Sequence, residues 1–164
     1  MLPPWAVVTA ERRAHVERVA TLIADWADRL RVEPAERARW VRAAWLHDAL
    51  RDAPAATELD HGPRCADRLR AEGERDEGVL HAIRFHSLGY AGWDAVGRML
   101  YLADYLEPGR RFEADAGAAF RARMPADRDA VLRDVARRRI ERLLHSDWPL
   151  AQETVGFWNA LVSA

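Results

Sequence analysis

The chain has 164 residues, with 25 basic and 26 acidic side chains and a formal net charge of −1. This length suits one domain of ordinary size rather than two. All the basic side chains are arginine, because the sequence contains no lysine. A net charge near zero argues against a protein that coats nucleic acid through bulk electrostatics. It is compatible with a small phosphorylated ligand held by a few arginines.

Cysteine content and hydropathy indicate the expected compartment. Cys65 is the lone cysteine, so an internal disulfide and a thiolate zinc site are both excluded, and we expect this residue in the core. No apolar run approaches the roughly 20 residues of a membrane span, and the first eight residues lack the basic region of a signal peptide. We therefore expect a cytoplasmic protein without membrane contact.

Helical periodicity runs through nearly the whole chain. From Val16 to Leu30, apolar residues recur at three- and four-residue steps, which places them on one face of a helix. Proline suits the first turn of a helix, and glycine suits the position after the last turn. On these signals we predict helices over about 15–30, 34–50, 63–73, 76–85 and 94–107, then a long helix after Pro125 and a last helix after Pro149.

The remaining segments give no sign of a sheet. No stretch shows the sustained alternation of apolar and polar residues that is typical of a strand. The part from Gly109 to Pro125 is the most loop-like, and the run Arg137–Arg139 is predicted to be a solvated helix face rather than a nucleic-acid site. The sequence therefore predicts one all-α domain of about seven helices, spanning residues 1–164.

Four polar side chains fall where the pattern predicts core. They are His15, His47, Asp48 and Asp104, and each lies within or beside an apolar stretch. An ionised carboxylate in such surroundings needs a strong positive partner. Without lysine, the candidates are arginine, a protonated histidine or a metal ion. Two imidazoles and two carboxylates make a sensible site for a divalent metal.

Two further histidines suit a second half of this site. His61 precedes a Gly-Pro pair at the start of a predicted helix, and His86 ends the predicted 76–85 helix close to its inward stripe. His81, in contrast, points nearly opposite Ile83 on an ideal helix, so we expect it to face solvent.

The order of these residues resembles the HD superfamily of metal-dependent phosphohydrolases. The signature of that superfamily is a histidine, a His-Asp pair and a distant aspartate, which here are His15, His47-Asp48 and Asp104. The resemblance covers about residues 12–161. Three segments are similar, more narrowly, to the symmetrical bis(5'-nucleosyl)-tetraphosphatase subgroup: His61-Gly62-Pro63, residues 82–89 and residues 103–110.

The resemblance implies an HD-domain helical bundle that binds one or two iron ions and cleaves diadenosine tetraphosphate symmetrically into two ADP. It implies a metal-site core over about 12–112, with C-terminal helices over about 125–162. The implied metal ligands are His15, His47, Asp48 and Asp104. The implied catalytic residues are Asp48, His61 and His86, and Asp48 would orient the attacking water or bridge two ions. His61 and His86 either hold a second metal or contact the phosphates, and both alternatives stay open.

The resemblance also implies substrate contacts and partners. Arg12, Arg51 and Arg110 match basic positions beside the ligands, where guanidinium groups can hold phosphate oxygens. The expected partner is a dinucleoside polyphosphate or ADP, with no nucleic acid and no membrane, and a homodimer is left open.

Two departures from the subgroup keep alternatives open. Arg51 stands where the subgroup usually has lysine, and Asp60 stands beside His61 where an apolar residue is more usual. The alternatives are an HD phosphohydrolase of other nucleotides and a nucleotide-binding module without turnover.

Overall fold

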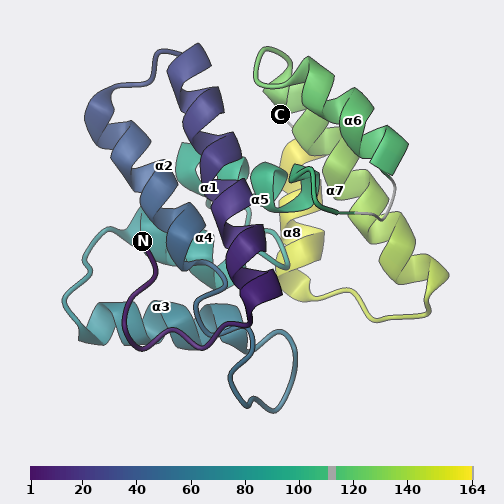
Figure 1. Ribbon diagram of the computed structural model, residues 1–164. Coiled ribbons are helices and arrows are strands. Elements are labelled where there is room, and N and C mark those ends of the chain that lie inside the picture. Colours follow the sequence, from purple (N-terminus) through teal and green to yellow (C-terminus); the bar gives the residue numbers. More distant parts are fainter. Residues whose placement is uncertain (111–113, 164) are drawn as a thin grey trace.

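The computed structural model describes residues 1–110 and 114–163, and within these residues the chain is helical without strands. Figure 1 shows the order of the helices. They are α1 (Ala10–Arg29), α2 (Pro34–Leu46), α3 (His61–Ala71), α4 (Glu77–Phe85), α5 (Ala95–Leu106), α6 (Ala114–Arg123), α7 (Arg128–His145) and α8 (Gln152–Val162). The predicted all-α class is confirmed.

Helix ends lie where the sequence carries capping residues. Thr9 caps α1 by accepting a hydrogen bond from the backbone N–H of Arg12. Asp76 and Asp94 cap α4 and α5 in the same way, each through a carboxylate oxygen at 3.0–3.1 Å from a backbone nitrogen. α3 begins at His61, so Pro63 lies in its first turn. Proline is tolerated there because the backbone N–H groups of the first turn have no acceptor within the helix.

The prediction of a loop between Gly109 and Pro125 was wrong, because α6 lies within this stretch. Half of its residues are alanines, and it lacks the apolar stripe that identifies the other helices. Alanine has the highest helix propensity, and this was the signal available in the sequence. Arg121 fixes α6 to the end of α5 by donating from Nη1 to the carbonyl oxygen of Leu106 at 2.8 Å.

The apolar core lies among α1 to α5. α1 packs along α2 and α5, while α4 packs against α2, α3 and α5. Ile23, Trp26, Leu80, Ile83 and Leu100 are almost fully buried there, and burial of each such side chain contributes roughly 1.5–3 kcal/mol. Cys65 is buried in the same core, as expected.

The C-terminal helices α6, α7 and α8 lie together on one side of this bundle, next to α5 (Figure 1). α8 also holds the segment that follows α4. The Oγ1 of Thr154 donates to the carbonyl oxygen of Leu88 at 2.8 Å, and the Phe157 ring packs against Trp93 and Tyr101. The C-terminal part is therefore attached beside His86 as well as to α5.

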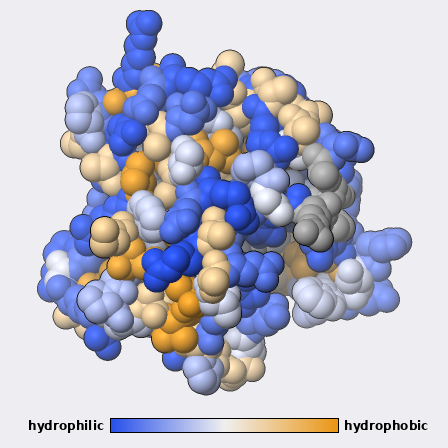
Figure 2. Space-filling model, viewed as in Figure 1, coloured by the Kyte–Doolittle hydropathy of each residue, from blue (hydrophilic) through white to orange (hydrophobic). Residues whose placement is uncertain are grey.

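Hydrophilic side chains cover most of the face seen in Figure 2, including its middle, with smaller apolar patches between them. None of the described helices combines the length and the apolar character that crossing a bilayer requires.

Candidate metal centre

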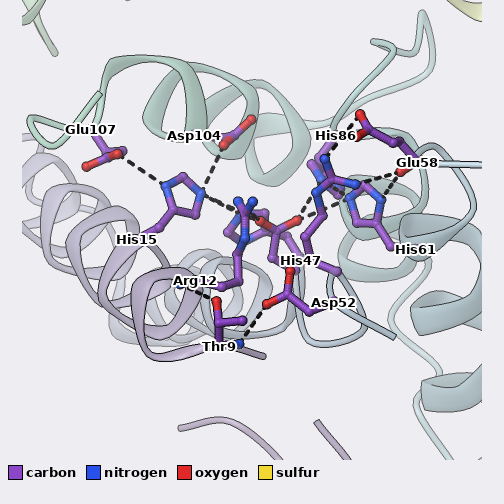
Figure 3. Close-up of polar contacts among 12 residues, drawn as sticks. Thr9, Arg12, His15, His47, Asp52, Glu58, His61, His86, Asp104 and Glu107 are labelled. Carbon is purple, nitrogen blue, oxygen red and sulfur yellow. Dashed lines mark hydrogen bonds and ion pairs between the residues drawn. The ribbon is translucent and has the colours of Figure 1, made fainter. Parts of the chain in front are cut away.

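The predicted His and Asp side chains converge on one buried centre. His15 lies in the second turn of α1, His47 and Asp48 directly follow α2, and Asp104 lies in the last turn of α5. The other two members, His61 at the start of α3 and His86 after α4, lie on the opposite side (Figure 3). All six residues are at most 6% exposed. Because α2 and α4 end here, the partial negative charges of their C-termini favour a cation.

One half of the centre is built around His15 and His47. Their Nε2 atoms face each other at 3.4 Å, and the Nε2 of His15 lies 3.2 Å from Oδ1 of Asp104. Donor atoms of these three residues all lie within 4.8 Å of one another. Asp48 adds its Oδ2, at 3.7 Å and 3.6 Å from the two Nε2 atoms. This half can hold one metal ion.

The other half is built around His61 and His86. Their Nε2 atoms lie 3.0 Å apart, and Oδ1 of Asp48 lies 3.1 Å from the first and 3.4 Å from the second. The two carboxylate oxygens of Asp48 therefore face different halves of the centre. A carboxylate in this position can bridge two cations.

In three of the histidines, the partner of Nδ1 indicates which ring nitrogen carries the proton. The Nδ1 atoms of His47, His61 and His86 each lie within hydrogen-bonding distance of a carbonyl oxygen three residues earlier in the chain. The acceptors are the carbonyl oxygens of Ala44, Glu58 and Ile83, at 2.7, 2.5 and 2.8 Å. A carbonyl oxygen only accepts, so these contacts assign a proton to each Nδ1 and leave the Nε2 lone pair of a neutral ring directed into the centre. That tautomer is the one that binds a metal.

Burial and charge set the protonation of the inner groups. Burial lowers the pKa of His47 to about 4, so this imidazole is neutral at neutral pH. Burial would raise the pKa of Asp48 and of Asp104. His47 and the other histidines outweigh this effect for Asp48, and Arg110 and His15 do so for Asp104, so both carboxyls have pKa values well below the usual range. Both aspartates are therefore ionised.

His15 carries a proton in these surroundings. Burial lowers its pKa, but hydrogen bonds to Asp104 and Glu107 outweigh burial and raise the pKa to about 9. The positive charge of this imidazolium balances the neighbouring carboxylates. A divalent cation would provide the same balance and displace the proton, since a metal-bound imidazole is neutral. Neutral imidazoles and ionised carboxylates facing one another form a donor set that fits a divalent metal.

Two of the predicted arginines border the centre. The Nη1 of Arg12 donates to Oδ2 of Asp48 at 2.8 Å. The Nη2 of Arg110 donates to Oδ1 of Asp104 at 2.6 Å, and its Nε donates to the backbone oxygen of the same residue at 2.7 Å. Both side chains are partly exposed. They connect the buried carboxylates with the surface.

Arg51 and Asp60, the two departures noted in the sequence, contact the loop before α3. Arg51 donates to the carbonyl oxygen of Glu58 at 3.0 Å, and His61 Nδ1 contacts the same oxygen. The carboxylate of Asp60 accepts from the backbone nitrogen and from Oγ1 of Thr57, and the backbone contact lowers its pKa. Arg51 therefore supports the segment that positions His61, and Asp60 is turned toward its own loop.

Sequence reasoning missed Glu107, which is only 2% exposed. Its Oε1 lies 3.3 Å from Nδ1 of His15, and it also accepts from Arg18 Nε at 2.5 Å and from Gly109 N at 2.7 Å. Figure 3 shows His15 between this carboxylate and Asp104. The available signal was spacing, because a residue three positions after Asp104 lies close to the same helix face.

The prediction of a solvated face over Arg137–Arg139 was wrong for its last residue. The side chain of Arg139 is 22% exposed and lies 3.9 Å from Asp104 Oδ2, with its guanidinium 4.4 Å from the centre of the Tyr101 ring. Its position follows the buried stripe Leu132, Val135 and Ala136 at helical spacing. His81, outside the centre, packs against Phe85 and Tyr90 with a side chain that is 36% exposed.

Comparison with known proteins gives a consistent result. Residues 12–109 match the family described as HD domain. Two relatives named "Bis(5'-nucleosyl)-tetraphosphatase, symmetrical" are 33% identical over 106 residues (Halalkalibacterium halodurans) and 31% identical over 114 residues (Bacillus subtilis). The alignments cover 64% and 65% of this chain but 56% and 58% of those proteins. The chain thus spans little more than half the length of the curated relatives it matches.

A solved structure supports the fold alone. A chain from Clostridium acetobutylicum, described as a "predicted HD superfamily hydrolase involved in NAD metabolism", superposes with a TM-score of 0.81 at 22% identity. The superposition covers 95% of this chain and 91% of that one. The similarity therefore includes the C-terminal helices.

Proposed function

Since this chain belongs to the HD domain family, we propose that it is a metal-dependent phosphohydrolase that cleaves diadenosine tetraphosphate symmetrically into two ADP. The observation that carries the proposal is the inward direction of the Nε2 atoms of four histidines around Asp48. The names of the curated relatives support the substrate. One water is consumed, and the bond broken joins the two middle phosphates.

The HD family implies a divalent metal, and we propose iron. Imidazole and carboxylate donors suit iron, and the resemblance described above implies it. His15, His47, Asp48 and Asp104 would hold the first ion. The opposite directions of the two Asp48 oxygens support a second ion, held by His61 and His86 with Asp48 between the two. Bound metal lowers the pKa of a coordinated water and so supplies hydroxide near neutral pH.

The chain's own residues bind the polyphosphate and direct the attack. When Asp48 and Asp104 are engaged by metal, Arg12 and Arg110 have guanidinium donors free for phosphate oxygens, and both lie at the exposed edge of the centre. Such contacts stabilise charge on the departing ADP. Arg51 would act indirectly through the loop that carries His61, because its contacts are with Glu58.

The assay is incubation of the purified protein with diadenosine tetraphosphate and ferrous iron without oxygen, followed by chromatography of the products. ADP as the sole product is expected. AMP with ATP would refute symmetrical cleavage. A panel of mononucleotides tests the alternative of a more general HD phosphohydrolase. Tight nucleotide binding without turnover would instead indicate a binding module.

A further inference from the structure

The guanidinium of Arg139 lies beside the centre and has no role in the proposal above. Arg139 belongs to α7, outside residues 12–109 that match the HD family. Its Nη2 lies 3.5 Å from the carbonyl oxygen of Ser87, the residue after His86, and 3.9 Å from Asp104 Oδ2. The side chain therefore spans the edge between the two halves of the metal centre.

Arg139 carries more hydrogen-bond donors than the protein satisfies. A guanidinium has five N–H donors, yet the distance to Asp104 exceeds a hydrogen bond and the contact with Ser87 is long. Its Nη1 is buried without an acceptor among the described residues. A buried donor without an acceptor is costly, and a charged one more so. Nη2, whose contacts with Ser87 and Asp104 are both long, can donate to an anionic oxygen at this edge.

Aromatic packing holds the guanidinium ready for such an oxygen. Tyr101 lies under it at 4.4 Å, and Tyr105 lies at 5.8 Å. α8 supports this arrangement, because Phe157 packs on Tyr101 and Thr154 binds the carbonyl oxygen of Leu88. A planar group fixed in this way loses little entropy when it binds phosphate in a bidentate manner. α7 and α8 thus hold the guanidinium of Arg139 at the edge of the metal centre.

We propose that Arg139 binds a non-bridging phosphate oxygen of the polyphosphate substrate, so that α7 forms part of the substrate site. This inference rests on the proposed function for the identity of the substrate. Arg139 then joins Arg12 and Arg110, and the three arginines approach the buried carboxylates from α7, from α1 and from the segment after α5.

The test compares Arg139→Gln with Arg133→Gln, a change at an exposed arginine on the same helix. Binding of inorganic tripolyphosphate to the metal-loaded protein is measured by calorimetry, and metal content is measured separately. Arg139→Gln is expected to weaken tripolyphosphate binding about 10- to 100-fold, as loss of a charged hydrogen bond does. KM for diadenosine tetraphosphate should rise by a similar factor. Metal content should stay at the wild-type value, and Arg133→Gln should behave as wild type.

Two results would overturn the inference. One is unchanged tripolyphosphate affinity in Arg139→Gln. The other is a loss of metal in that variant, which would mean that Arg139 acts by holding Asp104. If Arg139→Gln does not fold, Arg139→Met keeps the hydrocarbon contact over Tyr101 and takes its place. Should the wild-type protein fail to hydrolyse diadenosine tetraphosphate, the proposed function fails, yet the tripolyphosphate comparison still decides the role of Arg139.

Discussion

Two charged clusters lie toward opposite ends of α2, α4 and α5, and they differ in how their polar groups are paired. In the first, Arg39 of α2 donates to Glu36, Asp76 and Asp94 at 2.5–2.9 Å. Asp76 and Asp94 cap α4 and α5, while the metal centre lies at the C-terminal ends of these helices and of α2. Asp104 lies ten positions after Asp94, which is about 15 Å along the axis of α5.

The guanidinium of Arg39 is paired with acceptors within its own cluster, whereas the metal centre presents donor atoms that could hold an ion. Arg39 lies among three carboxylates, and the hydrogen bond that it donates to Asp76 outweighs burial and raises the arginine pKa. In the metal centre, the Nε2 atoms of four histidines face one another around Asp48, and a protonated His15 supplies the charge that a metal ion would replace. A cluster that serves stability pairs its own hydrogen-bond donors with acceptors. A cluster that serves binding leaves donors for a ligand.

The largest effect is expected when the middle of the metal centre is removed. Asp48→Ala deletes both oxygens that face the two histidine groups, so turnover should fall by roughly 10³-fold or more. The fold should remain helical, because the change removes a buried charge rather than apolar packing. Product chromatography, metal analysis and circular dichroism measure these effects. Wild-type turnover in this variant would contradict the metal assignment.

A matched pair of substitutions compares the two clusters directly. Glu107→Gln weakens the hold on His15 Nδ1, and loss of such an outer partner is expected to lower metal affinity about 10- to 100-fold. Glu36→Gln makes the same chemical change beside Arg39 and should leave metal affinity unaltered. Metal titration of both variants is the measurement. Equal affinity losses in the two would show that the clusters are not separate in function.

Breaking the Arg39 cluster should affect stability instead of activity. Arg39→Met leaves Glu36, Asp76 and Asp94 without their shared cation, and all four side chains are partly exposed. After allowance for solvent screening, we expect a loss of about 1–2 kcal/mol in the free energy of unfolding. Urea denaturation measures it. The KM and metal content of the folded variant should match the wild type, and a change in either would contradict this assignment.

Much of the site was predictable from the sequence because its residues interrupt apolar stripes. His15, His47, Asp48 and Asp104 are polar where helical periodicity predicts core, and all are buried. Helix caps such as Asp94 were equally readable, because a side-chain oxygen before an apolar helix is a local signal. Signals of this kind depend on neighbouring residues alone, so they can be recognised in the sequence without knowledge of the tertiary structure.

What could not be predicted depends on packing between distant segments. Arg139 reaches Asp104 only because α7 packs against α5, and no local pattern fixes that pairing. Arg51 resembles a phosphate-binding residue in sequence, but in the fold it contacts Glu58. Both arginines lie near chemistry-bearing residues, and only the tertiary structure shows which groups each one contacts.

The smallest expected effect concerns the pH dependence of the Arg39 cluster. The hydrogen bond from Arg39 outweighs burial and lowers the pKa of Asp76, so the folded state favours the ionised carboxylate. Its contribution is fully present above the unfolded pKa of about 3.9 and is lost as the pH falls through the lower folded pKa.

Asp76→Asn keeps a capping side chain but removes the charge. Wild type should therefore exceed this variant by under about 1 kcal/mol in unfolding free energy at pH 6. The difference should shrink toward zero in urea titrations at progressively lower pH. A difference that stays constant as the pH falls would mean that Asp76 stabilises the fold by something other than its charge.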